Sequence, residues 1–200
     1  DPSGERTMLA DNGANAGLAA SDLPALDGVD VVYLTGYAPL APLSRAGVLE
    51  MVRTINSRGI PIVFDPATVG GMQGVPVEEI LSWCALMDTV IMNEEEAIYL
   101  SELSDCESAL NFFIERTPRA IIKRGSAGAI GLERGGQIIS VAAHTSAVVD
   151  TTGAGDAFAA GFIDAFTGRR DFSHAIERAS AVAGHCVAIV GARGRVGTQI

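Results

Sequence analysis

The sequence has little cysteine and no long apolar run. Its three cysteines, Cys84, Cys106 and Cys186, form neither a C-x-x-C pair nor a cluster with histidine. This pattern argues against a zinc site and is typical of reduced thiols in the cytosol. No apolar stretch reaches membrane-spanning length, and the first residues lack the charged and apolar regions of a signal peptide. We therefore expect a cytoplasmic protein with no membrane partner.

Positive charge is also scarce. The chain has 14 Lys and Arg residues against 24 Asp and Glu, which gives a formal net charge of -10. This balance argues against a nucleic acid or an anionic membrane surface as the main partner. An anionic ligand would need local positive potential, which backbone amides and a metal ion can supply. With 200 residues, 48% of them hydrophobic, the chain fits a single domain over residues 1–200 with a sizeable core.

Apolar runs typical of strands alternate with helical patterns along the chain. This alternation predicts an α/β fold with a mostly parallel sheet, whose ligands gather at the carboxyl ends of the strands. A hairpin after the last parallel strand adds antiparallel edge strands. The predicted strands are residues 29–35, 60–64, 89–92, 120–123, 129–132 and 137–141, and the main helices are residues 44–57, 75–86, 105–116, 156–166 and 172–189.

A glycine turn near residue 153 organises the chain. Val148 and Val149 suggest a strand end, and the small and apolar residues after Asp156 predict a buried helix. Gly153 and Gly155 let the backbone approach a ligand, and the first amide N–H groups of the helix lack internal partners, which favours phosphate binding. Asp156, in the first helical turn, could accept a proton from a hydroxyl held there. Donors beside a base predict phosphoryl transfer to an alcohol.

Glycine turns of this kind also occur for reasons unrelated to phosphoryl transfer. A lone G-x-G before a helix is more often a tight connection than a catalytic loop. A Walker-type loop does not fit, because no Gly-Lys-Ser/Thr follows. A dinucleotide fingerprint also fits poorly, because Phe158 occupies its third small position and Glu177 lies in a helical pattern.

The run Asp150-Thr151-Thr152-Gly153-Ala154-Gly155-Asp156, followed by Ala157-Phe158, resembles the C-terminal signature of the ribokinase/PfkB family of carbohydrate kinases. The resemblance implies a ribokinase-like three-layer α/β/α sandwich. It makes Gly153, Ala154 and Gly155 the anion hole and Asp156 the catalytic base. It covers the C-terminal two thirds of a family chain, so we expect a truncated chain that lacks the N-terminal part and most of the lid, with residues 1–20 as a candidate lid-return segment.

The resemblance also implies acceptor-binding residues. Asn15, Tyr37 and Asp65 match family positions near the acceptor sugar, where Asp156 also acts. Each also has a plainer interpretation, because first residues often fray, Tyr37 fits a loop aromatic, and Asp65 before Pro66 fits a turn former.

Asn93 and Glu96 resemble the family's N-x-x-E motif, associated with the magnesium and phosphate environment. They would hold Mg²⁺ through water, because this hard cation keeps most of its waters. The alternative is that the three carboxylates at residues 94–96 only complement the helix dipole, which contributes roughly 0.3–1 kcal/mol each.

The rest of the nucleotide site is also implied by resemblance. Lys123, Gly125 and Gly128 belong to a segment that borders the nucleotide phosphates, although Lys123 also fits a solvated surface cation. Gly191 and Ala192 would close the nucleotide pocket, although a flexible tail is the alternative. Asp150 matches an aspartate that joins a monovalent cation, K⁺, in some relatives.

These patterns predict transfer of the ATP γ-phosphoryl group to a hydroxyl of a sugar or sugar-like substrate, with ATP and Mg²⁺ as cofactors. The alternative from another class is an inactive nucleotide-binding remnant or a regulatory partner of a sugar kinase. An exposed apolar sheet edge would then favour a homo-oligomer.

Overall fold

The computed structural model describes residues 13, 17–144, 147–169 and 171–192. Its centre is a six-stranded sheet in the order β1-β2-β3-β4-β5-β6. β1 to β4 pair in parallel, and β5 and β6 continue the sheet in antiparallel pairing, as the sequence predicts. The strands are β1 (Val32–Thr35), β2 (Ile62–Asp65), β3 (Thr89–Asn93), β4 (Arg119–Lys123), β5 (Ala129–Glu133) and β6 (Ile139–Val141).

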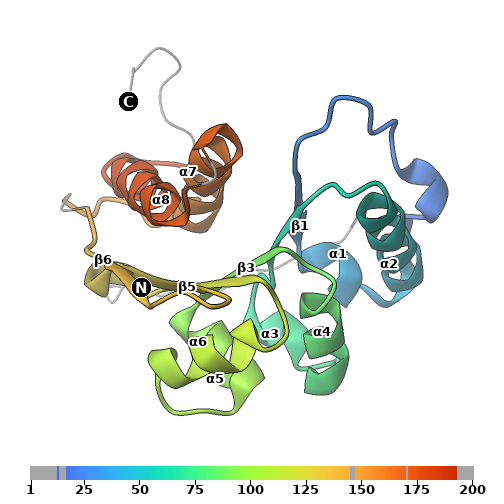
Figure 1. Cartoon of the computed structure of the whole chain (residues 1–200), viewed down its shortest axis with the longest axis horizontal. Helices are drawn as coiled ribbons and strands as arrows, with labels where there is room; N and C mark the ends of the chain where they lie inside the picture. The colour runs from blue at the N-terminus through green and yellow to red at the C-terminus, as the bar shows by residue number, and fades with distance from the viewer. Residues whose placement is uncertain (1–12, 14–16, 145–146, 170, 193–200) are drawn as a thin grey trace.

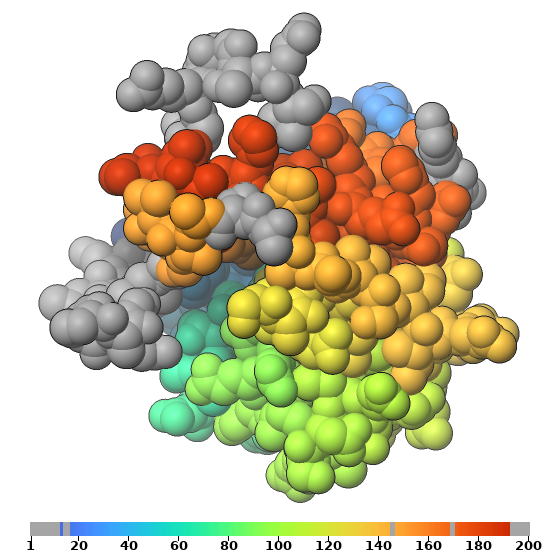
Figure 2. All heavy atoms as spheres, turned by 90° about the vertical axis from the view of Figure 1, so that its left-hand side faces the viewer, coloured from blue at the N-terminus to red at the C-terminus, as the bar shows by residue number. Residues whose placement is uncertain are grey.

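Helices cover both faces of this sheet, which makes three layers (Figure 1). α7 and α8 lie on one face, and α3 to α6 lie on the other. Figure 2, seen from the left-hand side of Figure 1, shows the α7–α8 layer in red and orange above the sheet and green helices below it. The helices are η2 (Ala20–Asp22), α1 (Tyr37–Leu40), α2 (Pro42–Ser57), α3 (Val69–Met72), α4 (Val77–Cys84), α5 (Glu94–Ser101), α6 (Cys106–Ile114), η3 (Gly125–Ala127), α7 (Ala154–Arg169) and α8 (Phe172–Val187).

The alternation of side chains along each strand builds two cores. Phe64, Met92 and Ile122 point to the face covered by α4, α5 and α6. Side chains one residue earlier point to the opposite face and pack against α7 and α8, among them Val63, Ile91 and Ile121. Apolar residues on both faces explain why these strands are nearly continuous apolar runs in the sequence.

Small residues bring α7 and α8 close together and onto the sheet. A side chain on Gly161 of α7 would lie 3.0 Å from the Cα atom of Ala179 in α8. A side chain on Gly131 of β5 would likewise meet Phe172 at 3.1 Å. Phe162 and Phe172 pack edge to face with ring centroids 6.0 Å apart. The helix pair therefore packs closely over one face of the sheet, with Gly161 and Gly131 at two points of close approach.

Three local predictions differ from the structure. The sequence predicts a buried strand over residues 29–35, but β1 starts at Val32 and is half-buried throughout, because β2 is its one partner strand among the described residues. The expected loop after β1 is the short helix α1. Val148 and Val149 belong to no strand and are 68% and 55% exposed, because the Val149 N–H donates to Val187 O at the end of α8.

Asn15 and most of the expected lid-return segment lie outside the described residues. No helix in the described ranges is long and apolar enough to cross a membrane.

Candidate functional site

Three parallel strands end in polar residues on the same side of the sheet. Asp65, Asn93 and Lys123 are the last residues of β2, β3 and β4. Asp65 and Lys123 each stand two positions after a residue that packs against α7 or α8, so strand alternation points their side chains toward that helix layer, whereas the Asn93 side chain turns to the start of α5 and accepts the Glu96 N–H. The carboxyl ends of parallel strands are where open α/β sheets bind ligands.

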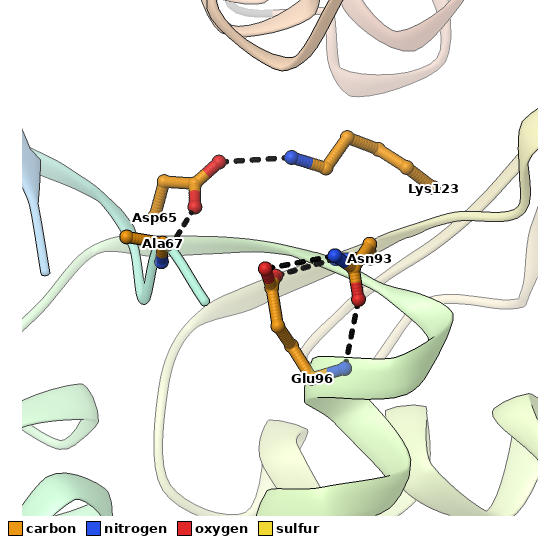
Figure 3. Close-up of polar contacts among 5 residues, drawn as sticks. All are labelled: Asp65, Ala67, Asn93, Glu96 and Lys123. Atoms are coloured by element: carbon orange, nitrogen blue, oxygen red, sulfur yellow. Dashed lines mark hydrogen bonds and ion pairs between the residues drawn. The ribbon is translucent and has the colours of Figure 1, made fainter. Parts of the chain in front are cut away.

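Lys123 and Asp65 form an ion pair across the ends of β2 and β4 (Figure 3). The Lys123 Nζ atom lies 2.8 Å from Asp65 Oδ2, and the two side chains are 18% and 11% exposed. The other carboxylate oxygen, Oδ1, accepts the Ala67 N–H at 2.9 Å. This bond supports Ala67 in the left-handed region, with φ of 82°, where a residue other than glycine is uncommon. Both oxygens of Asp65 are therefore engaged.

Asn93 and Glu96 form a reciprocal cap at the start of α5 (Figure 3). Asn93 Oδ1 accepts the Glu96 N–H, while Glu96 accepts the Asn93 backbone N–H and the Asn93 Nδ2 donor, each at 2.8 Å. Glu96 is 2% exposed. Burial, together with the charge of Asp65, raises the pKa of Glu96 to about 7, although the Asn93 backbone donor and Lys123 act to lower it. The spacing that resembles a metal motif is thus also a capping box.

The glycine turn leads directly into α7. The helix begins at Ala154, which places Asp156 in its first turn, and Asp156 is exposed. Gly153 has φ of 80°, and a side chain on it would lie 2.8 Å from the Ala192 methyl group. Glycine is therefore required there both for the backbone conformation and for the approach of Ala192.

Asp150 ties this turn to the segment after α8. Its Oδ1 atom accepts the Thr152 N–H and its Oδ2 atom accepts the Gly191 N–H, both at 2.9 Å. The carboxylate thereby holds Gly191 and Ala192 against the turn. Both of its oxygens serve this structural role.

The strand ends and the glycine turn face one another. A side chain on Gly155 would lie 3.4 Å from Lys123 Nζ, so the ammonium stands beside the turn. Tyr33, in the middle of β1, lies near both halves. Burial raises the pKa of Tyr33, and the carboxylates of Asp65, Asp156 and Glu96 raise it further. Residues from β2, β4, α5 and α7 thus surround one region.

The segment after β4 turns sharply. Gly125 and Gly128 have φ of 56° and 84°, and the Arg124 N–H donates to Gly128 O at 2.7 Å. A side chain on Gly128 would clash with the backbone of Val141. Of the predicted acceptor residues, Tyr37 lies in α1 with 49% of its surface exposed.

Two residues at this site do not stand out in the sequence. Tyr33 reads as an ordinary strand residue, yet its place two residues before the end of β1 puts it on the face shared with Asp65. Cys186 of α8 lies under the turn, with its Sγ atom 3.6 Å from Thr152 O. Burial raises the pKa of Cys186, and Asp150 and Asp156 raise it further. Strand parity could have predicted Tyr33, whereas Cys186 depends on how α8 packs.

The oxygen atoms of Asn93 and Glu96 suit a cation that keeps its own water ligands. Over the described ranges, no three His, Cys, Asp or Glu side chains gather in a way that could hold a metal ion. Both Glu96 oxygens already accept hydrogen bonds from Asn93. These residues fit Mg²⁺ held mainly by a bound phosphate ligand and touched through water, and they do not fit a dedicated protein cage.

This architecture defines an open α/β protein with polar strand ends facing the N-terminus of a glycine-led helix, the arrangement expected of a phosphate-binding site. The model of the pfkB family of carbohydrate kinases matches residues 1–197. The chain belongs to the pfkB family.

Relatives and solved structures agree with this assignment. An uncharacterized sugar kinase of Archaeoglobus fulgidus is 28% identical over 197 residues, which cover 96% of this chain and 76% of that protein. Adenosine kinase from Sinorhizobium meliloti superposes with a TM-score of 0.83 at 25% identity, covering 90% of this chain and 56% of that one. An Escherichia coli ribokinase II candidate, solved with ATP and Mg²⁺, superposes with a TM-score of 0.79 at 26% identity, and the match covers 88% of this chain and 58% of that one. The chain therefore spans little more than half of either solved structure.

Proposed function

We propose that this chain carries the nucleotide-binding and catalytic part of a kinase that transfers the ATP γ-phosphoryl group to a hydroxyl of a sugar or sugar-like substrate. The observation that carries the proposal is that the start of α7, which holds Gly155 and Asp156, lies beside Lys123 and its partner Asp65 at the strand ends. The relative solved with ATP and Mg²⁺ supports this choice of phosphate donor.

The glycine turn would perform two chemical tasks. The amides of Gly153, Ala154 and Gly155 would stabilise the charge of the transferring group, because they are oriented before the phosphate arrives. Asp156 would accept the hydroxyl proton. A helix N-terminus favours the ionised carboxylate and makes it a weak base, but in a loose transition state the proton leaves late, so position matters more than basicity.

Nucleotide and acceptor would bind on different sides of the turn. The loop of Lys123, Gly125 and Gly128, with Gly191 and Ala192, would border the nucleotide, and Asp65 and Tyr37 would face the acceptor, together with Asn15. Asn93 and Glu96 would hold Mg²⁺ through water; when bound, the ion neutralises charge on the ATP phosphates. Two further predictions remain. One is a K⁺ requirement at Asp150, tested by replacing K⁺ with Na⁺. The other is a homo-oligomer formed through the edge of β1, which has β2 as its one partner strand among the described residues.

The test is ADP formation from ATP with ribose, fructose, 2-keto-3-deoxygluconate and nucleosides as acceptors, beside calorimetric ATP binding. Acceptor-dependent ADP formation that Asp156→Asn abolishes is expected. ATP binding with no turnover on any acceptor would favour the inactive nucleotide-binding remnant, and absence of ATP binding would contradict both.

A further inference from the structure

Lys123 is the only lysine in the 200 residues, and its ammonium lies between the two halves of the site. On one side Nζ pairs with Asp65 Oδ2 at 2.8 Å. On the other side, Nζ is 3.4 Å from the position that a side chain on Gly155 would occupy. The cation is therefore within reach of both an acceptor-side carboxylate and the predicted phosphate position.

Asp65 needs a cation while the site holds no ligand. Only 7% of this residue is exposed, and a buried carboxylate without a counter-charge is costly. Its Oδ1 atom accepts the Ala67 N–H, so Oδ2 is the oxygen whose partner can change. Among the residues with described positions, Lys123 is the one side chain that hydrogen-bonds to Oδ2.

Lys123 has unused donor capacity on the side of the turn. An ammonium has three N–H donors, and the Asp65 contact uses one of them. The lysine stem is flexible and carries a point charge that can turn between neighbours. The terminal phosphate of a nucleotide held at the turn would offer more negative charge than one carboxylate and would compete for the ammonium.

We propose that Lys123 exchanges partners during the reaction cycle. It pairs with Asp65 while the turn is empty and pairs with the terminal phosphate when ATP is bound. The exchange frees Asp65 Oδ2 to accept a hydrogen bond from the acceptor hydroxyl, so nucleotide binding prepares the acceptor side. This inference rests on the proposed function and makes Lys123 a positioning residue for the acceptor carboxylate.

A double-mutant cycle with the nonhydrolysable analogue AMP-PNP and Mg²⁺ tests the exchange. Lys123→Met is expected to weaken AMP-PNP binding about tenfold, as for one charge-assisted hydrogen bond. It should change the affinity for ADP, which lacks the terminal phosphate, less than about twofold. Asp65→Asn should tighten AMP-PNP binding several-fold, because the lysine no longer has to leave a carboxylate. This gain should disappear in the Lys123→Met background, and a gain that persists there would overturn the proposal.

The ion pair of Arg178 and Asp164 supplies matched controls. It joins α8 to α7 at 4.0 Å and is more exposed, with side chains at 34% and 76%. Arg178→Met and Asp164→Asn change the net charge by the same amounts as the test variants. Neither control variant should alter AMP-PNP affinity. If the variants of both ion pairs changed the affinity equally, the effect would come from the net charge of the protein, and the exchange would be contradicted.

A single lysine also allows a direct readout in the unsubstituted protein. Lysine labelled with ¹³C at the ε position gives a signal that Lys123→Arg identifies by its loss. The signal should move on addition of AMP-PNP with Mg²⁺ and stay nearly in place with ADP and Mg²⁺. If calorimetry shows that both nucleotides bind but the signal responds to neither or equally to both, the exchange is wrong and the kinase proposal stands. If neither nucleotide binds, the proposed function itself is contradicted.

Discussion

The two halves of the site are built in opposite ways. At the strand ends, Asp65 and Glu96 are 7% and 2% exposed, and their charges are engaged by Lys123 and Asn93. At the glycine turn, Thr151, Thr152 and Asp156 are exposed. The anion donors that we propose there are backbone amides. Buried charges must be paired before any ligand arrives, whereas amides at a helix start can be solvated by water. Changes at the strand ends should therefore affect folding and function together, and changes at the turn should affect mainly function.

The largest expected effect is at the turn. Asp156→Asn should lower kcat by roughly 10²–10⁴-fold, the usual contribution of a general base. Because Asp156 is exposed, the free energy of unfolding should change by less than about 0.5 kcal/mol. Steady-state kinetics and chemical denaturation measure the two quantities, and AMP-PNP affinity should be retained. Unchanged turnover would remove Asp156 from the role of base.

At the strand ends, we expect the stability of the protein to depend on pH through Glu96. Since burial raises the pKa of Glu96 from 4.5 to about 7, folding favours its protonated form. Its contribution to stability is therefore full below about pH 4.5 and is lost as pH rises through about 7. Relative to Glu96→Gln, the unsubstituted protein should lose on the order of 1–3 kcal/mol between those pH values. Urea denaturation at pH 4.5, 6 and 8 tests this, and parallel curves for the two proteins would show that Glu96 does not titrate in this window.

A comparison of Gly153 with Gly135 can distinguish the effect of backbone strain from the effect of a close neighbour. Gly153 and Gly135 have nearly equal φ of 80° and 82°, but only at Gly153 would a side chain meet a neighbour. Both alanine variants should lose about 1 kcal/mol of stability from the left-handed backbone. Gly153→Ala should also push the turn away from Ala192 and lower kcat/KM at least about tenfold, while Gly135→Ala keeps full activity. Equal activity in both variants would show that the Ala192 contact is not needed.

Two helix caps give the smallest expected effect. Asn93 caps α5 inside the site, and Asp105 caps α6 on the surface. Replacing either by alanine should cost about 1 kcal/mol of unfolding free energy. Only Asn93→Ala should weaken binding of AMP-PNP with Mg²⁺, measured by calorimetry. If both variants bind alike, the N-x-x-E spacing is a cap and nothing more.

Local patterns predict the parts of the fold that depend on neighbours in sequence. β2, β3 and β4 are recognisable as apolar runs, and the predicted start of α2 lies two residues from its observed start at Pro42. Helices α1 and α3, with four residues each, escape prediction because so short a segment shows no helical period. Val148 and Val149 mislead because β-branched residues favour strands, but here the N–H groups of Val149 and Asp150 donate to Val187 O at the end of α8.

The composition of the site is predictable only in part. The Asn93–Glu96 pair is three residues apart, so its spacing alone allows the contact. The Lys123–Asp65 pair joins residues 58 positions apart, and no local pattern links them. Strand parity would have placed both on one face, but the pairing follows from the order of strands in the sheet, which is a property of the whole fold.

The layer made by α7 and α8 has a consequence for biosynthesis. These helices come after all six strands in the chain, and they alone cover Val63, Ile91 and Ile121 among the described helices. During translation, the sheet and the helix layer on its other face can assemble while this apolar face is not yet covered by α7 and α8. A nascent chain stalled before residue 154 should therefore attract chaperones and show no kinase activity, because α7 carries both part of this cover and Asp156, the residue that we propose as the base.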